Sequence, residues 1–184
     1  MTDAEAAGNP VVIWVTEGTW RASVDAALDL LPAGAPITLL HVTPAELPAA
    51  AHGAYLGLLG RGQPERDPGR RVAELAAVSA GELLDAAARR LGRPCQQMER
   101  RGVTEREVVT AAADARLLIM ARDGDRSRLG PKSLGKAARF VVDHAPCPVL
   151  LVWPGTAPAV QTIPPPPRPP GRGPHHRPEA SGLM

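Results

Sequence analysis

Apolar and polar residues alternate along this chain in blocks that predict strands and helices in turn. A continuous apolar run at residues 11–15 is typical of a strand buried on both faces of a sheet, and mainly apolar segments at residues 37–42, 116–121 and 147–153 predict further strands. Apolar residues at three- to four-residue spacing predict helices over residues 20–31, 71–91, 104–115 and 134–144. The mostly polar residues 95–102 fit a short strand at the edge of the sheet. This alternation predicts an α/β fold: an open, mainly parallel sheet of about five strands with helices on both faces.

Two local patterns refine the helices. Inward positions of the long helix are expected to include Val72, Leu75, Leu83, Leu84 and Ala87. Thr104 with Glu107 has the spacing of a capping box, in which the two side chains satisfy the first N–H groups of a helix. Residues 43–72 are rich in Ala, Gly and Pro and predict no element.

The composition changes abruptly near the end of the chain. Ten of the 21 prolines fall within residues 154–184, which contain almost nothing apolar enough to pack. Such a segment cannot bury enough surface to offset its ordering entropy. We therefore expect one domain over residues 10–154 and a disordered Pro-rich C-terminal tail over residues 155–184, with polyproline II character. A solvated tail is favoured over a docking peptide for a proline-recognising partner.

Charge and composition narrow the classes of partner. The formal net charge is +2, and the tail alone contributes +2 through Arg168, Arg172 and Arg177 against Glu179, so the predicted domain is neutral. A neutral domain argues against nucleic acid as the main partner, because binding to the phosphate backbone needs a basic face. No apolar run approaches the ~20 residues that cross a bilayer, so no membrane association is expected. The N-terminus lacks the features of a signal peptide and the two cysteines have no metal-like spacing, which together favour a cytoplasmic protein.

The sheet topology predicts where a ligand would bind. In open α/β sheets, ligands bind beyond the carboxyl ends of the strands, where the strand order reverses. That rule brings together residues 16–19, residues 42–43 and the loop after Met120. We expect these three segments to line one crevice.

The stretch GPKSLGKA, residues 130–137, comes close to a P-loop. Gly130 and the pair Gly135-Lys136 fit the pattern, but Ala137 stands where a hydroxyl should hold magnesium. Eight residues also separate Gly130 from the end of the preceding strand at Ala121, whereas a P-loop joins its strand directly to its helix. A phosphoryl-transfer P-loop is therefore not expected. Since no Ser-His-Asp or Cys-His set is evident either, we expect no enzyme.

Three stretches of the chain resemble a known family. HVTP, LLIMARDG and GKAARFVVDHAPCPVLLVW resemble the universal stress proteins, over residues 10–154. The resemblance implies a Rossmann-like fold of the adenine nucleotide alpha-hydrolase type and a regulatory role in the stress response. It also implies binding of ATP or another adenine nucleotide, and a homodimer formed through the last strand. No chemistry beyond slow ATP hydrolysis is implied.

The resemblance also implies the residues of a nucleotide site. The family's glycine loop, G-x-x-G followed after nine residues by G-[ST], aligns with Ala121, Gly124, Gly135 and Lys136. Glu17 and Gly18 stand where the family often has Asp-Gly, and Val42 where a strand backbone meets adenine. The full candidate set is Glu17, Gly18, Val42, Met120, Ala121, Gly124, Gly135 and Lys136.

The glycine loop departs from the family pattern in three ways. Ala121 replaces a glycine, the spacing is one residue longer, and Lys136 replaces the hydroxyl residue. Six cations and two carboxylates between residues 122 and 139 make phosphate binding through charge plausible. Alternatively, Lys136 pairs with Asp123 or Asp125 in a solvated basic loop, and the protein is a dimeric scaffold that binds no nucleotide.

Overall fold

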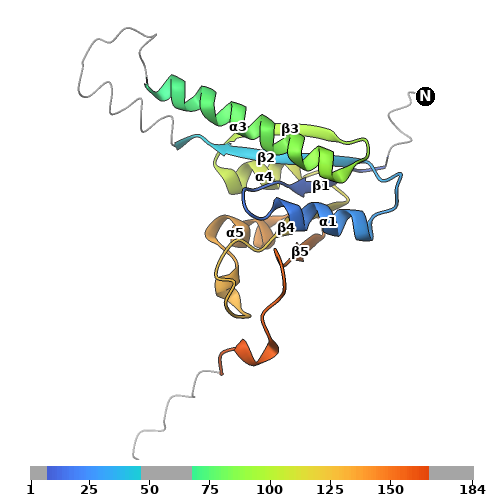
Figure 1. Cartoon of the computed structure of the whole chain (residues 1–184), viewed down its shortest axis with the longest axis vertical. Coiled ribbons are helices and arrows are strands. Elements are labelled where there is room, and N and C mark those ends of the chain that lie inside the picture. The colour runs from blue at the N-terminus through green and yellow to red at the C-terminus, as the bar shows by residue number, and fades with distance from the viewer. Residues whose placement is uncertain (1–7, 47–67, 166–184) are drawn as a thin grey trace, which may run out of the picture.

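The computed structural model describes residues 8–46 and 68–165, and its core is a single five-stranded sheet (Figure 1). The strands are β1 (Val11–Trp14), β2 (Ile37–Pro44), β3 (Gln96–Gly102), β4 (Leu117–Ala121) and β5 (Val149–Val152). Their order is β3-β2-β1-β4-β5, and every neighbouring pair is parallel. The open parallel sheet predicted from the apolar runs is confirmed, including the polar edge strand β3.

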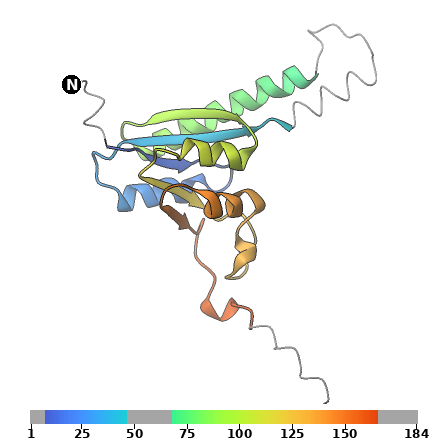
Figure 2. The ribbon, with the colours of Figure 1, turned by 180° about the vertical axis from the view of Figure 1, so that it is seen from behind.

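Helices cover both faces of the sheet (Figures 1 and 2). They are α1 (Trp20–Leu30), α3 (Pro68–Leu91), α4 (Thr104–Ala111) and α5 (Lys136–His144), with short 3-10 turns η2 (Pro131–Ser133) and η3 (Val160–Thr162). Alternate strand residues point to opposite faces. In β1, Val11 and Ile13 accordingly pack with α1 and α3, while Val12 and Trp14 pack with α4 and α5.

The two cysteines lie on opposite sides of this sheet. Cys95 packs against the cluster formed with α1 and α3, and Cys147 against the cluster formed with α4 and α5. Both are free thiols, and burial raises the pKa of each above its ordinary value. The sheet between them prevents a disulfide.

Two helix details differ from the sequence predictions. Leu75 was expected to point inward, but 60% of its surface is exposed. The buried stripe of α3 runs through Ala80, Leu84, Ala87 and Leu91, and at about 100° per residue Leu75 lies half a turn from Leu84.

The capping box is the second difference. Helix α4 starts at Thr104 with Val103 as its N-cap and no side-chain cap, and it ends at Ala111 rather than near residue 115. Glu107 turns instead toward β3, where its carboxylate lies 3.7 Å from the guanidinium of Arg100. Glu107 therefore pairs with Arg100 of β3 and not with a backbone N–H at the start of α4.

The first part of the expected tail also differs from the prediction. Residues 155–165 are described and contain η3, in which Thr162 Oγ1 accepts a hydrogen bond from the Leu129 N–H at 3.0 Å. The segment contributes only the acceptor, the Thr162 hydroxyl. The contact therefore does not depend on backbone N–H groups, which prolines lack. The prediction of disorder for residues 166–184 lies outside the described residues, as does most of the segment at 43–72 that predicted no element.

Within the described ranges, none of the helices has the length and apolar character needed to span a membrane.

Candidate functional site

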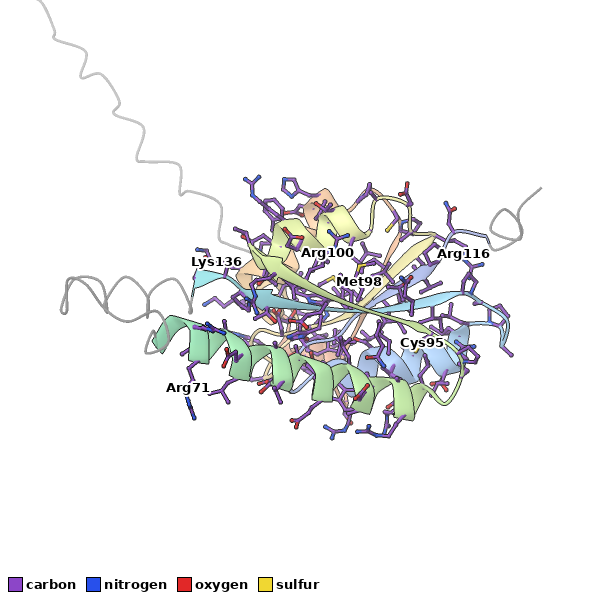
Figure 3. The ribbon with its side chains drawn as sticks, turned by 90° about the horizontal axis from the view of Figure 1, so that it is seen from above. Arg71, Cys95, Met98, Arg100, Arg116 and Lys136 are labelled. Atoms are coloured by element: carbon purple, nitrogen blue, oxygen red, sulfur yellow. The ribbon has the colours of Figure 1, made fainter. Side chains whose placement is uncertain are left out.

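The strand order places one divergence of loops between β1 and β4. From β1 the chain moves to β2 and β3 on one side of the sheet, and then crosses to β4 and β5 on the other. The carboxyl ends of β1 and β4 are neighbours, but the loop after β1 leads to α1 on one face and the loop after β4 leads to α5 on the opposite face. This is the switch point at which open α/β sheets hold ligands. Lys136, at the start of α5, lies at this edge of the sheet (Figure 3).

The turn after β1 is shaped by Gly18. The Thr16 carbonyl accepts hydrogen bonds from the N–H groups of Thr19 and Trp20, and the Thr16 and Thr19 hydroxyls lie 2.6 Å apart. Gly18 has a φ of 73°, a left-handed conformation that glycine adopts without the strain of a Cβ. The turn leaves Glu17 exposed, with no hydrogen bond or ion pair to any residue that the structure describes.

Strand β2 reaches beyond the end of β1 and carries Val42 there. The Val42 side chain is buried, with 4% exposed, in the cluster that contains Trp14 and Met120. The Leu40 carbonyl accepts a hydrogen bond from Val15, so the main chain of Leu40 faces β1, and the main chain of Val42, two residues on, faces the same side. Because β1 ends at Trp14, opposite Leu40, the Val42 N–H and carbonyl have no β1 residue to pair with.

The end of β4 is ordinary strand. Met120 and Ala121 are buried and pair with Leu151 and Val152 of β5. Only glycines have positive φ among the described residues, so Ala121 is not in a conformation that needs glycine. Alanine in place of the family's glycine therefore causes no backbone strain here.

The loop from residue 122 to 135 closes on itself through its two arms. The Gly124 N–H donates to the Ser133 carbonyl at 3.0 Å, and the Asp125 N–H donates to the Lys132 carbonyl at 2.8 Å. A Cβ at Gly124 would collide with the carbonyl oxygen of Lys132. Gly124 is thus needed for the close approach of the two arms, and its N–H is already hydrogen-bonded to the Ser133 carbonyl.

The other matched glycine, Gly135, is the N-cap of α5 and is also occupied. Its N–H donates to Asp123 Oδ1 at 2.7 Å, and a Cβ on Gly135 would lie 2.8 Å from Asp123 Oδ2. The Asp123 carboxylate therefore lies against the N-terminus of α5, where the helix dipole favours negative charge.

The alternative in which Lys136 pairs with Asp123 or Asp125 is wrong. Asp123 binds the Gly135 N–H, while Asp125 binds the hydroxyl and N–H of Ser127 and lies 3.2 Å from Arg128 Nε. The two hydrogen bonds from Ser127 hold the pKa of Asp125 below its ordinary value. Lys136 is exposed and has no ion pair with a described residue.

Sequence reasoning missed the residues that hold the loop in place. The Arg122 guanidinium donates to the Ser133 hydroxyl and lies 4.8 Å from the centre of the Trp153 ring, and the main-chain N–H of Arg122 donates to the Val152 carbonyl. The role of Asp123 was missed as well. Both contacts join residues more than ten positions apart, so no local pattern such as a capping box could have revealed them.

A cavity of about 370 Å³ lies beside this loop. It is lined by Arg128, Leu129, Gly130, Pro131, Lys132, Arg139 and Pro164. The contact between Thr162 and Leu129 brings the last described residues to this cavity. None of the eight candidate residues lines this cavity, so it is separate from the site predicted at the switch point between β1 and β4.

An open parallel sheet with a switch point between β1 and β4 defines a doubly wound α/β domain. The sequence model of the universal stress protein family matches residues 17–152, and the chain belongs to that family. No curated protein matches the chain.

Solved structures of the same fold include three that cover most of this chain. The hypothetical protein MJ0577 is 18% identical, with a TM-score of 0.58 over 80% of this chain and 98% of its own. A universal stress protein in complex with cAMP is 16% identical, with a TM-score of 0.52 over 81% of this chain and 99% of its own. A family member from Burkholderia pseudomallei is 22% identical, with a TM-score of 0.50 over 77% of this chain and 94% of its own. At these identities the structures establish the fold alone.

Proposed function

We propose that this protein is a regulatory protein of the stress response that binds an adenine nucleoside or nucleotide, ATP included, at the crevice between β1 and β4. One observation carries the proposal: beyond the end of β1 the Val42 main-chain groups have no β1 partner, and the turn that follows β1 exposes the Glu17 carboxylate, which has no partner among the described residues. An adenine ring carries both a donor and an acceptor, which a strand's N–H and carbonyl can match, and a carboxylate can accept hydrogen bonds from ribose hydroxyls. A relative of the same fold is described in complex with cAMP.

The remaining residues have roles that follow from their positions. Gly18 sets the turn that presents Glu17, and Met120 contributes to the apolar cluster that supports Val42. Lys136, at the first position of α5 and without an ion pair in the described structure, supplies positive charge to a ligand phosphate. ATP would thus be held by strand backbone at its base and by side-chain charge at its phosphates.

We propose that binding, without catalysis, is the protein's activity, in the cytoplasm as expected from the sequence. The crevice offers Glu17 as its carboxylate and Lys136 as its cation, a pair suited to holding a ribose and a phosphate. Among the described residues, no three His, Cys, Asp or Glu side chains gather in a way that could hold a metal ion.

The proposal is tested by ligand release and calorimetry. Denaturing the purified protein should release adenine nucleoside or nucleotide, and titration of the stripped protein with adenosine should give saturable heat. Glu17→Gln should weaken adenosine by about tenfold, since a hydrogen bond to a charged group contributes about 1.5–3 kcal/mol. Glu82→Gln, an exposed change on α3, is the matched control and should change nothing. Equal affinities for adenosine in all three proteins would contradict the assignment of Glu17.

A dimeric scaffold that binds no nucleotide is the second candidate function, favoured by the apolar edge strand β5. Leu118 donates to the Pro148 carbonyl and Arg122 to the Val152 carbonyl, so alternate β5 residues face β4. By alternation, the main-chain groups of Val149 and Leu151 point outward, where no described strand pairs with them. This edge is available to the same strand of a second copy, as we propose for a homodimer.

The scaffold and its interface can be tested with proline. Leu151→Pro removes one outward N–H and should leave the pairing of β5 with β4 intact, but it should block pairing with a second copy. Gln97→Pro does the same at the opposite edge, on β3, and is the control. Sedimentation should show a dimer for the parent protein and Gln97→Pro, and a monomer for Leu151→Pro. A monomeric parent protein would contradict the interface.

A further inference from the structure

Asp123 lies where the phosphate end of the proposed site would be, and it carries the same charge as a phosphate. We propose that this carboxylate is a built-in competitor of ligand phosphate, so that the site selects adenosine over adenine ligands with a phosphate chain. This inference rests on the proposed function, because it concerns the other end of the same site.

The contact between Asp123 and α5 is direct. Asp123 Oδ1 accepts the Gly135 N–H at 2.7 Å, within the range of a charge-assisted hydrogen bond, which is stronger than a neutral one. Its Oδ2 also lies close to Gly135, since a Cβ there would be only 2.8 Å away. A phosphate that bound the N-cap of α5 would need the same N–H group and the same space.

The second matched glycine cannot replace the first. The Gly124 N–H donates to the Ser133 carbonyl, and the adjacent backbone pair from Asp125 to Lys132 holds the two arms together. Releasing Gly124 would mean opening the loop, because its contact with Lys132 is between backbone atoms. Releasing Gly135 requires only that one exposed side chain, Asp123, turn away.

Charge makes this competition depend on the ligand. A neutral nucleoside held by Val42 and Glu17 does not need the Gly135 N–H, so Asp123 leaves its affinity unchanged. Each phosphate group adds negative charge near a fixed carboxylate, and like charges at short range disfavour each other. Lys136 offsets part of this repulsion from the next residue of α5. The expected order of affinity is adenosine first, then AMP, then ATP.

The first arm of the test is calorimetry with adenosine, AMP and ATP on the full chain. Asp123→Asn keeps an oxygen for the Gly135 N–H and removes the charge, so ATP should bind at least about tenfold more tightly while adenosine stays within about twofold. Asp125→Asn makes the same charge change two residues away, on a carboxylate that binds Ser127 and Arg128, and should have much less effect. An unchanged ratio of ATP to adenosine affinity in Asp123→Asn, or an equal gain in Asp125→Asn, would overturn the proposal.

The second arm needs no adenine. Inorganic tripolyphosphate is titrated into the ¹⁵N-labelled parent protein and into Asp123→Ala, and the amide resonance of Gly135 is followed. We expect a saturable shift in Asp123→Ala and at least about tenfold weaker binding by the parent protein. The same response in both proteins, or none in either, would overturn the role of Asp123. Failure of all adenine ligands to bind would instead contradict the proposed function, while this arm still decides the inference.

Discussion

The two halves of the candidate site differ in how far their polar groups are already satisfied. In the strand half, formed by Glu17, Gly18 and Val42, the Glu17 carboxylate has no partner among the described residues, and the backbone of β2 extends past the end of β1. In the loop half, residues 121–136, the N–H groups of both matched glycines bind oxygens of the chain itself. The difference shows that a glycine in the right place does not establish what its N–H binds. A ligand can use the strand half as it stands, whereas the loop half must first give up a contact.

The largest effect is expected from Gly124→Ala, which tests whether the loop half is closed by packing. The new Cβ would collide with a backbone carbonyl, so the arms must separate. We expect a loss of about 2–3 kcal/mol in the free energy of unfolding, in line with other overpacking substitutions, and a fall of about 5–10 °C in Tm. Gly34→Ala, at an open position, is the control and should stay within about 0.5 kcal/mol in denaturant unfolding. A mild effect of Gly124→Ala would mean that the loop is not locked.

Lys136→Ala should separate binding from stability. Loss of a charged contact to phosphate should weaken ATP by about tenfold or more in calorimetry and leave adenosine unchanged. Because a cation at a helix N-terminus is unfavourable, the same change should raise Tm slightly. Lys132→Ala removes a neighbouring cation from η2 as a control. Equal ATP affinity in the parent protein and Lys136→Ala would remove Lys136 from the site.

Gly18→Ala probes the strand half at its turn. A φ of 73° is costly for alanine, by about 1–2 kcal/mol, and Tm should fall by about 2–6 °C. Gly18→Asn should be tolerated better, since asparagine visits this conformation more readily. Thermal melts of the two variants check this, and adenosine affinity should fall with Ala more than with Asn. The reverse ranking would show that the turn does not depend on the backbone conformation.

The smallest effect is expected at the contact between the loop half and the end of the described chain. Thr162→Val removes the acceptor for the Leu129 N–H and should cost about 0.5–1.5 kcal/mol. Removing residues 156–184 should lower Tm little further, because this is the one hydrogen bond between the described part of the segment and the loop half. Differential scanning calorimetry of Thr162→Val and of the truncated protein measures both values of Tm. A much larger fall on truncation would mean that the removed residues contribute to the fold.

The fold was predictable because four of the five strands are mainly apolar runs, while β3 is a short polar strand at the edge of the sheet. The end of β1 and the position of Val42 followed from those runs, and with them the strand half of the site. The orientation of α3 was harder, since a helix rich in Ala offers several apolar stripes and burial of Leu84 and Ala87 excludes Leu75.

The loop half could not be predicted from the sequence. The glycines are in place, but the partner of the Gly135 N–H is twelve residues away and depends on how the arms fold. One alternative from the sequence paired Lys136 with Asp123 or Asp125, yet hydrogen bonds from Gly135 and Ser127 hold these carboxylates instead. Backbone donors that lie close compete successfully with a long, flexible lysine, whose ordering costs rotamer entropy.

The two edges of the sheet have different consequences for assembly. Strand β3 carries Glu99, Arg100 and Arg101 along its edge, and charged side chains of this kind discourage edge-to-edge pairing. Strand β5, with the sequence VLLV, has no such protection. A sheet that can grow from one end only cannot polymerise: when two copies join through β5, both remaining ends are charged. Pairing through β5 therefore stops at two copies, and the charged edge strand β3 is sufficient to prevent filaments.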